Sequence, residues 1–261
     1  MENSNTTELG NANYTPLDFA QHTVLVTGAN RGIGLAIVKA LLATPIKKVY
    51  ATARNLAAMP DLQDARLEVL QLDITDDASV TRAANIASDV SLLINNAGIV
   101  AAGAFTETEL ATLNTDMQTN YFGTLRAIQA FLPALRANTQ AEASAAIANV
   151  TSIGALANLP SIGGYCASKA AIFSASQGLR IELAKAPIQV HTINPGPIDT
   201  DMTKDFDGDK TDSAVAAEAI LQGLREGQQD IFPDPASQAM FAAWQSNYKS
   251  LEAIFAQMSE A

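Results

Sequence analysis

The sequence predicts an α/β fold in which a parallel sheet is covered by helices on both faces. Short apolar runs rich in β-branched residues recur along the chain, and segments with helical spacing of apolar residues lie between them. The length of 261 residues also suits one large domain of this class, which can bury a sizeable core. No repeat with a period of about 20–50 residues is present, which argues against a solenoid.

The predicted elements alternate regularly from Thr23 onward. Because both faces of a parallel sheet are covered, its strands are expected to be nearly continuous apolar runs. We expect a last helical stretch after Pro233 and Pro235, where large apolar residues recur at helical spacing. The predicted strands are 24–26, 49–52, 67–72, 92–94, 146–150 and 188–193, and the predicted helices are 35–42, 78–87, 107–136, 164–185 and 213–226.

Two segments fall outside this alternation. Residues 1–20 are rich in Asn and Thr and show no period, so we expect a mobile N-terminal arm and a single domain over 21–261. The stretch 199–212 carries six aspartates and is either a solvated loop or a mobile lid over a cleft. We assign 197–213 as the expected substrate lid.

Composition limits the partners and the compartment. The chain has 16 Lys and Arg against 27 Asp and Glu, a net charge of −11, which repels nucleic acid and anionic lipid at long range. One cysteine, Cys166, excludes an internal disulfide framework and favours a reducing compartment. We find no membrane span, signal peptide or metal-binding His/Cys cluster in the sequence and expect a cytoplasmic protein.

A glycine-rich turn, Thr27–Gly34, joins the first predicted strand to the first helix. Its glycines permit close backbone approach, and the helix N-terminus offers free N–H groups to a pyrophosphate. The spacing is G-x-x-x-G-x-G and not the commoner G-x-G-x-x-G, and a plain tight connection is the alternative. The position at the first strand–helix junction favours phosphate binding by Gly28, Asn30, Arg31, Gly32, Ile33 and Gly34.

Two later strand ends add candidate ligand contacts. Asp73 is placed to accept from an adenine amino group while Ile74 packs on the ring, although Asp73 is as readily explained as a helix cap. Asn96 follows the fourth strand, where its amide can bond neighbouring backbone, and Gly98 leaves room for a cofactor.

Tyr165 and Lys169 are four residues apart and share one face of a predicted helix. Such a pair is common by chance, but it permits specific chemistry. A free tyrosine has a pKa of about 10, and an ammonium ~4 Å away at a dielectric of ~20 would lower it by about three units. That shift would bring the pKa of the phenol close to the pH at which it must exchange a proton.

Taken together, these motifs resemble the short-chain dehydrogenase/reductase family. Six elements occur in that family's order over roughly residues 22–200, in the branch with a TGxxxGxG loop and a YxxxK pair. The resemblance implies a single Rossmann-type domain with a doubly wound parallel sheet of about seven strands. The elements are Thr27–Gly34, Asn95–Gly98, Asn120, Ser152, Tyr165–Lys169 and Asn194-Pro195-Gly196.

The resemblance also implies residue roles. Tyr165 would exchange a proton with the substrate oxygen, Lys169 would lower its pKa and bond the nicotinamide ribose, and Ser152 would stabilise the charge that develops on that oxygen. Asn120 would hold a water that relays protons. In the plainer interpretation Asn120 is a polar helix residue and Ser152 is a cap. The segment Pro195-Gly196-Pro197-Ile198 would close over the nicotinamide, with Ile198 and Thr200 on its carboxamide.

The end of the second strand bears on cofactor choice. NAD-selective proteins of this fold usually place an acid there, whereas this chain has Ala53 followed by Arg54. Arg31 in the glycine loop approaches from the other side. Two guanidiniums without a carboxylate suit a 2′-phosphate, although either arginine is also explained as a surface charge. We therefore predict NADPH/NADP as the cofactor.

The function implied by the resemblance is NADPH-dependent, reversible reduction of a ketone or aldehyde to an alcohol. One alternative is a 3-oxoacyl-carrier-protein reductase, which the acidic net charge disfavours because carrier proteins are acidic too. Another is a non-catalytic NADP-binding sensor or regulator, a class that typically loses the catalytic Tyr or Lys. The family further implies a homodimer or homotetramer in which helices around 107–136 and 164–185 pack across a twofold axis.

Overall fold

The computed structural model describes residues 14–139 and 144–260. Its centre is a seven-stranded sheet in the order β3-β2-β1-β4-β5-β6-β9, with every neighbouring pair parallel. The predicted doubly wound parallel sheet is therefore confirmed. The strands are β1 Thr23–Val26, β2 Lys48–Ala53, β3 Leu67–Gln71, β4 Leu92–Asn95, β5 Ala145–Val150, β6 Ile188–Ile193 and β9 Asp230–Ile231.

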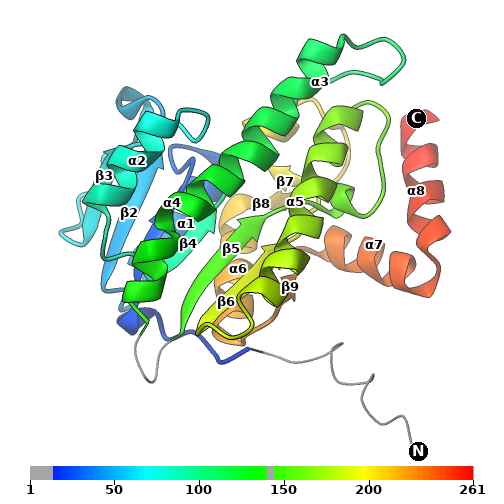
Figure 1. Cartoon of the computed structure of the whole chain (residues 1–261). Helices are drawn as coiled ribbons and strands as arrows, with labels where there is room; N and C mark the ends of the chain where they lie inside the picture. Colours follow the sequence, from blue (N-terminus) through cyan, green and yellow to red (C-terminus); the bar gives the residue numbers. More distant parts are fainter. Residues whose placement is uncertain (1–13, 140–143, 261) are drawn as a thin grey trace, which may run out of the picture.

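Helices cover both faces of this sheet (Figure 1). On one face lie α1 (Gly32–Leu42) and α6 (Ser213–Arg225), and on the other lie α2 (Asp77–Ile86), α4 (Thr124–Ala137) and α5 (Gly163–Glu182). Side chains of a strand alternate between faces, so each central strand contributes to both apolar cores. Leu92 and Ile94 of β4 pack with α1 and α6, whereas Leu93 packs against the opposite layer.

The helix predicted over 107–136 has three parts in the structure. It consists of α3 (Leu110–Asp116), a π-helical stretch over Met117–Gly123, and α4. π-Helical turns are rare and occur frequently at functional sites. The π-helical turn therefore marks the residues around Asn120 as candidates for a functional site.

The predicted last helical stretch is two helices, α7 (Pro235–Ser246) and α8 (Tyr248–Glu260). They are separated by Asn247, whose backbone is extended. Both pack on the segment after β5, where Leu251 and Phe255 bury Ile153. The short strand β9 was not predicted, because two residues carry no periodicity that a sequence pattern can reveal.

Residues 14–20, assigned from the sequence to a mobile arm, pack on the domain. Leu17 and Phe19 are buried, the backbone N–H of Tyr14 donates to the carbonyl of Gly227 (2.8 Å), and that of Leu17 donates to Leu224 (3.3 Å). The predicted arm is therefore too long, because two apolar side chains anchor its second part beside α6. Residues 1–13 lie outside the described part of the chain.

The acidic segment after β6 has regular structure. Its two short strands, β7 (Ile198–Asp199) and β8 (Thr211–Asp212), pair in parallel. Asp212 then caps α6 by accepting from the N–H groups of Ala214 and Val215. The segment is thus tied to the domain at both ends.

No helix of the described residues is long and apolar enough to cross a membrane. Within 14–139 and 144–260, no three or more His, Cys, Asp or Glu side chains are grouped so that they could hold a metal ion.

The buried central strands predict a sharp contrast between two leucine substitutions. Leu93 on β4 is 0% exposed, whereas Leu110 on α3 is 83% exposed. We expect Leu93→Ala to lower the free energy of unfolding by about 2–5 kcal/mol, because a cavity is left in the core. The matched Leu110→Ala control should change it by less than about 0.5 kcal/mol. Chemical denaturation followed by circular dichroism measures both, and equal losses would contradict the packing described.

Candidate active site

One cleft opens along the carboxyl ends of the parallel strands. It is lined by the β1–α1 turn, by residues following β2, β3, β4 and β5, by α5, and by the segment after β6. In a doubly wound sheet this edge is where ligands bind. All the site residues predicted from the sequence line this cleft except Gly34 and Asn120.

The glycine loop takes a backbone that side chains would prevent. Gly28 and Gly32 have positive φ angles of 64° and 54°. A Cβ at Gly28 would lie 2.8 Å from the Cα of Ala97, and one at Gly34 would collide with the side chain of Asn96 and the carbonyl of Gly28. Gly34 therefore lets α1 pack closely beneath the loop and does not itself line the cleft.

The N-terminus of α1 faces this cleft without a side-chain cap. Arg31 occupies the capping position and makes no capping hydrogen bond. The first N–H groups of a helix have no partner within the helix, and together with the helix dipole they favour an anion. A glycine loop without Cβ atoms above an uncapped helix end fits the pyrophosphate of a dinucleotide.

Asn96 ties the end of β4 to the glycine loop. Its Nδ2 donates to the carbonyls of Thr27 (2.9 Å) and Gly28 (3.0 Å). In return the Thr27 hydroxyl accepts from the backbone N–H groups of Asn96 (3.0 Å) and Ala97 (2.9 Å). The predicted backbone bonding of Asn96 is thus seen directly, and the loop is held to the sheet by side chains from both strands.

Asp73 and Ile74, which follow β3, line one end of the cleft. The Oδ1 atom of Asp73 accepts from the N–H (2.9 Å) and the hydroxyl (2.7 Å) of Thr75. The helix α2 is capped instead by Asp76. The side chain of Asp73 therefore stabilises a local turn, and Asp73 also lines the cleft.

Ser152, Tyr165 and Lys169 meet at the other end of the cleft. Ser152 follows β5, and its hydroxyl accepts from the N–H of Gly154 (3.1 Å), so the plainer capping role is present as well. Lys169 is buried on α5, and its Nζ donates to the carbonyl of Val150 (2.8 Å) and lies 5.6 Å from the centre of the Tyr165 ring. Burial lowers the pKa of Lys169 to about 8.

The expected lowering of the pKa of Tyr165 is not what the structure gives. Burial raises the pKa of this phenol to about 12, and a hydrogen bond with Ser152 opposes that rise only in part. The Lys169 ammonium is directed at a backbone carbonyl and not at the phenol oxygen. The expectation that the Lys169 ammonium lowers the pKa of Tyr165 is therefore wrong here, because burial has the larger effect on that pKa. The phenol stays protonated around neutral pH.

Asn120 lies beside the cleft in the π-helical stretch and is buried. Its Nδ2 donates to the carbonyl of Ile99 (2.9 Å) and the hydroxyl of Ser168 (2.9 Å), and its Oδ1 accepts from the N–H of Ile99 (2.8 Å). Both amide hydrogens are thus used within the protein. A role for Asn120 in holding a relay water stays a prediction.

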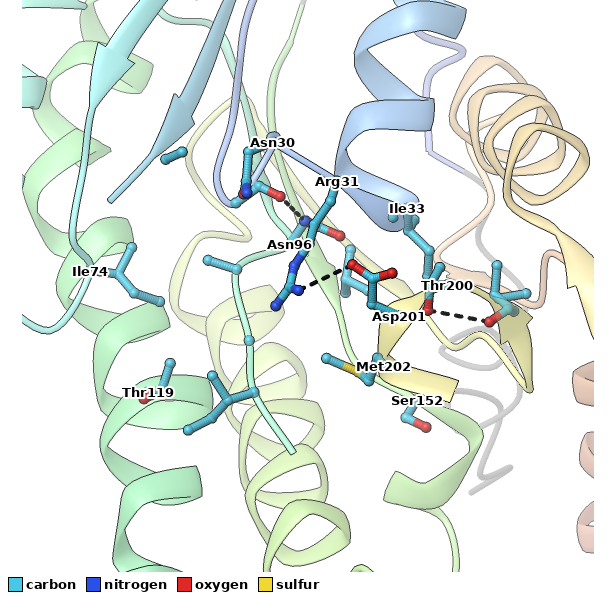
Figure 2. Close-up of a pocket in the computed structure, with 18 of the residues that line it drawn as sticks. Asn30, Arg31, Ile33, Ile74, Asn96, Thr119, Ser152, Thr200, Asp201 and Met202 are labelled. Carbon is cyan, nitrogen blue, oxygen red and sulfur yellow. Dashed lines mark hydrogen bonds and ion pairs between the residues drawn. The ribbon is translucent and has the colours of Figure 1, made fainter. Parts of the chain in front are cut away.

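Two arginines stand at the mouth of the cleft. Figure 2 shows Arg31 reaching to Asp201 in the acidic segment, and the two exposed side chains form an ion pair at 3.2 Å. Arg54 is exposed and lines the cleft beside Ala53, with no carboxylate at that strand end. The sequence did not reveal the pairing of Arg31, because Asp201 lies far away along the chain.

The segment after β6 closes one side of the cleft. Pro195, Gly196, Ile198 and Thr200 all line it, while their contact with a nicotinamide stays a prediction. The N–H of Gly196 donates to Asp234 (2.8 Å), which also caps α7. The C-terminal helices are therefore linked to this wall through one buried carboxylate.

Sequence reasoning missed several lining residues, most of them direct neighbours of motif residues. Five of them, Asn55, Leu72, Ala97, Thr151 and Asp201, lie within two positions after a strand end. Thr119 and Met202 had no such signal. The missed residues are Asn55, Leu72, Thr75, Ala97, Ile99, Thr119, Val150, Thr151, Asp201, Met202 and Thr203.

A protein-family model described as short chain dehydrogenase matches residues 22–211. Over 236 residues the chain is 30% identical to retinol dehydrogenase 8 of Bos taurus, and the match covers 85% of this chain and 72% of that protein.

Solved structures agree with this match. A short chain dehydrogenase from Burkholderia cenocepacia in complex with NADP is similar with a TM-score of 0.84 and 36% identity, covering 90% of this chain and 97% of that one. NADPH-bound carbonyl reductase from chicken fatty liver is similar with a TM-score of 0.73 and 29% identity, covering 82% and 89%. The sheet, the glycine loop and these matches together show that this chain belongs to the short chain dehydrogenase family of oxidoreductases.

Proposed function

We propose that the protein reduces a ketone or aldehyde to an alcohol with NADPH, and runs the reverse reaction when product accumulates. The observation that carries this proposal is that Ser152, Tyr165 and Lys169 line the same cleft as the uncapped N-terminus of α1. One end of the cleft suits a dinucleotide phosphate and the other carries a proton donor. The similarity to an NADPH-bound carbonyl reductase supports the same reaction class.

The cofactor would be held along the carboxyl edge of the sheet. When bound, NADPH supplies a hydride to the carbonyl carbon. The glycine loop and the end of α1 would bind its pyrophosphate, Asp73 and Ile74 would contact the adenine, and Gly98 would leave room for the cofactor. A Cβ at Gly98 would lie 3.1 Å from Oδ1 of Asn120 and 3.5 Å from Nζ of Lys169, so a larger side chain would crowd both groups.

Tyr165 is the group we assign to proton transfer. Because burial raises the pKa of its phenol to about 12, the protonated form prevails near neutral pH. That is the form needed to donate a proton to the oxygen of a carbonyl under reduction. Ser152 would stabilise the charge on that oxygen by donating its hydroxyl hydrogen.

Arg54 is the main argument for NADPH over NADH. It lines the cleft, is exposed, and follows Ala53 where an acid would bond a ribose 2′-hydroxyl. Arg31 would have to exchange Asp201 for the 2′-phosphate. That exchange is inexpensive, because exposed ion pairs contribute only about 0–1 kcal/mol.

The substrate end favours an uncharged carbonyl compound. Ile99 and Met202 line the cleft with apolar side chains. Asp199 and Asp201, in the segment after β6, are each paired with a cation, Lys210 and Arg31. An anionic substrate would have to compete with these carboxylates for the two cations. We propose that residues 197–213 act as the cover of this end. The carrier-protein and sensor alternatives remain predictions that a substrate assay separates.

The first test combines a substrate panel with a tyrosine substitution. The unsubstituted protein should oxidise NADPH with neutral ketones or aldehydes, followed at 340 nm. Tyr165→Phe keeps the ring but removes the proton, so turnover should fall by roughly 10²- to 10⁴-fold, while NADPH binding measured by fluorescence persists.

Tyr248→Phe, at an exposed position at the start of α8, is the matched control and should retain full turnover. Activity restricted to a β-ketoacyl thioester would favour the carrier-protein reductase. NADPH binding without turnover on any substrate would favour a sensor. Near-normal activity of Tyr165→Phe would refute its assignment.

For cofactor choice, we expect a preference for NADPH over NADH of about 10-fold or more in kcat/KM, the value of one charge-assisted contact. The double substitution Ala53→Asp with Arg54→Ala should erode or invert it, because it restores an acceptor for the 2′-hydroxyl and removes a phosphate contact. The dissociation constant of NADPH should rise and that of NADH should fall. Arg82→Ala, on the exposed side of α2, is the charge-matched control and should change neither.

We also propose a homodimer or homotetramer formed through α3–α4 and α5. Leu110 on α3 and Ile181 on α5 are 83% and 79% exposed, the two highest exposed fractions among the large apolar side chains of the described residues. Ile181→Asp should yield a 27.4 kDa monomer by light scattering, whereas Val215→Asp on α6 should leave the assembly intact. A monomeric unsubstituted protein would contradict the proposal.

A further inference from the structure

Asp116, the last residue of α3, is a carboxylate that is completely buried. Its exposed fraction is 0%. Its Oδ1 accepts from the N–H of Ala101 (3.0 Å), whereas its Oδ2 is buried and has no hydrogen-bond partner among the described residues. A buried acceptor left without a partner is costly, so its presence beside the cleft calls for an explanation.

Asp116 and Asn120 lie one turn apart and hold the same segment. Asn120 bonds both the N–H and the carbonyl of Ile99, and Asp116 accepts from the N–H of Ala101. Ile99 and Ala101, two positions apart in the chain after β4, are thereby fixed to the end of α3 and the π-helical stretch that follows it. Ile99 lines the cleft, so the two side chains set the position of its wall.

The hydrogen bond to Ala101 does not itself require a charge, since an asparagine oxygen would accept it equally well. The charge acts instead on α5, which packs against α3. Gly164 stands opposite the free oxygen: a Cβ there would lie 2.9 Å from Oδ2 of Asp116. The absence of a side chain lets α5 approach the carboxylate closely.

The charge of Asp116 acts in the same direction on the pKa of three titratable groups of α5, the helix that packs on α3. Its negative charge raises the pKa of Lys169 against the lowering by burial, and it raises the pKa of Tyr165 and of Cys166. Burial in turn raises the pKa of Asp116, while Lys169 and the Ala101 N–H lower it. The carboxylate therefore favours the protonated state of both proposed catalytic side chains.

We propose that Asp116 is a positioning residue of the active site, an ionised counter-charge that keeps Lys169 and Tyr165 protonated while anchoring the Ile99–Ala101 wall. This inference deepens the proposed function and rests on it for the roles of Tyr165 and Lys169. The electrostatic part concerns the protein alone and is measurable without cofactor or substrate.

The test replaces Asp116 by asparagine, which keeps the shape and an acceptor for Ala101 but removes the charge. The pKa of Lys169 is measured in the ligand-free protein by NMR of carbon-13-labelled lysine, with Lys169→Arg assigning the signal. We expect the pKa of Lys169 to fall by about one unit in Asp116→Asn, as for loss of a nearby opposite charge. The alkaline limb of carbonyl reduction should move to lower pH as well, because the pKa of Tyr165, the proton donor in that direction, also falls.

Glu109→Gln, at the exposed start of α3, removes the same formal charge and should leave both titrations unchanged. A shift in Asp116→Asn no larger than in Glu109→Gln would overturn the proposal and leave Asp116 only a wall anchor. If Asp116→Asn does not fold, the protonation state of the Asp116 carboxyl in the unsubstituted protein tests the proposal instead. Its carbon-13 shift, assigned through the backbone, must show an ionised group at pH 8, and a protonated group there would overturn the proposal.

These outcomes are separable from those of the proposed function. A protein that reduces no carbonyl compound would refute the reaction, yet the lysine titration would still report the charge of Asp116. Conversely, an active carbonyl reductase with an unshifted Lys169 would refute only the role of Asp116.

Discussion

The hydrogen bond from Lys169 to the carbonyl of Val150 is the contact on which the geometry of the cleft depends. It joins the middle of α5 to the last residue of β5, so the helix cannot slide along the sheet without leaving a buried ammonium unpaired. Ser152 follows that strand end by two residues, and Tyr165 precedes Lys169 by about one helical turn. One buried bond therefore sets how a strand-end hydroxyl and a helix phenol face each other, and the same burial lowers the pKa of the lysine and raises that of the tyrosine.

Much of the fold could be predicted from the sequence because it depends on local patterns. The apolar strands and the glycine turn need only neighbouring residues, and the cleft follows from the rule that parallel strands end at one edge. The misses are non-local. The pKa of Tyr165 depends on how deeply it is buried, which no spacing reveals. Arg31 meets Asp201 only after the chain has folded, and β9 becomes a strand only through its pairing with β6.

The residues after β6 link the wall of the cleft to the C-terminal helices, which are distant in sequence. Asp234 accepts from Gly196 and caps α7, so the C-terminal helices and the cleft wall share one buried side chain. Phe232, Phe241 and Trp244 stack beyond it. One wall of the cleft is thus tied to residues that lie outside every motif recognised in the sequence.

The π-helical stretch at Met117–Gly123 has a consequence for how this site tolerates change in length. A π turn closes over five residues where an α turn closes over four, so the stretch holds roughly one residue more than a regular helix would. Because a π turn rotates less per residue, losing that residue and closing into a regular helix would leave α3 and α4 almost in their present phase. Winding all seven residues as a regular helix would instead rotate α3 relative to α4 by about 100°. Asp116 would then turn away from Ala101, although every side chain in the motifs would still be present. The wall of the site is therefore encoded partly in this wider turn, and a sequence could keep its whole signature and still lose it.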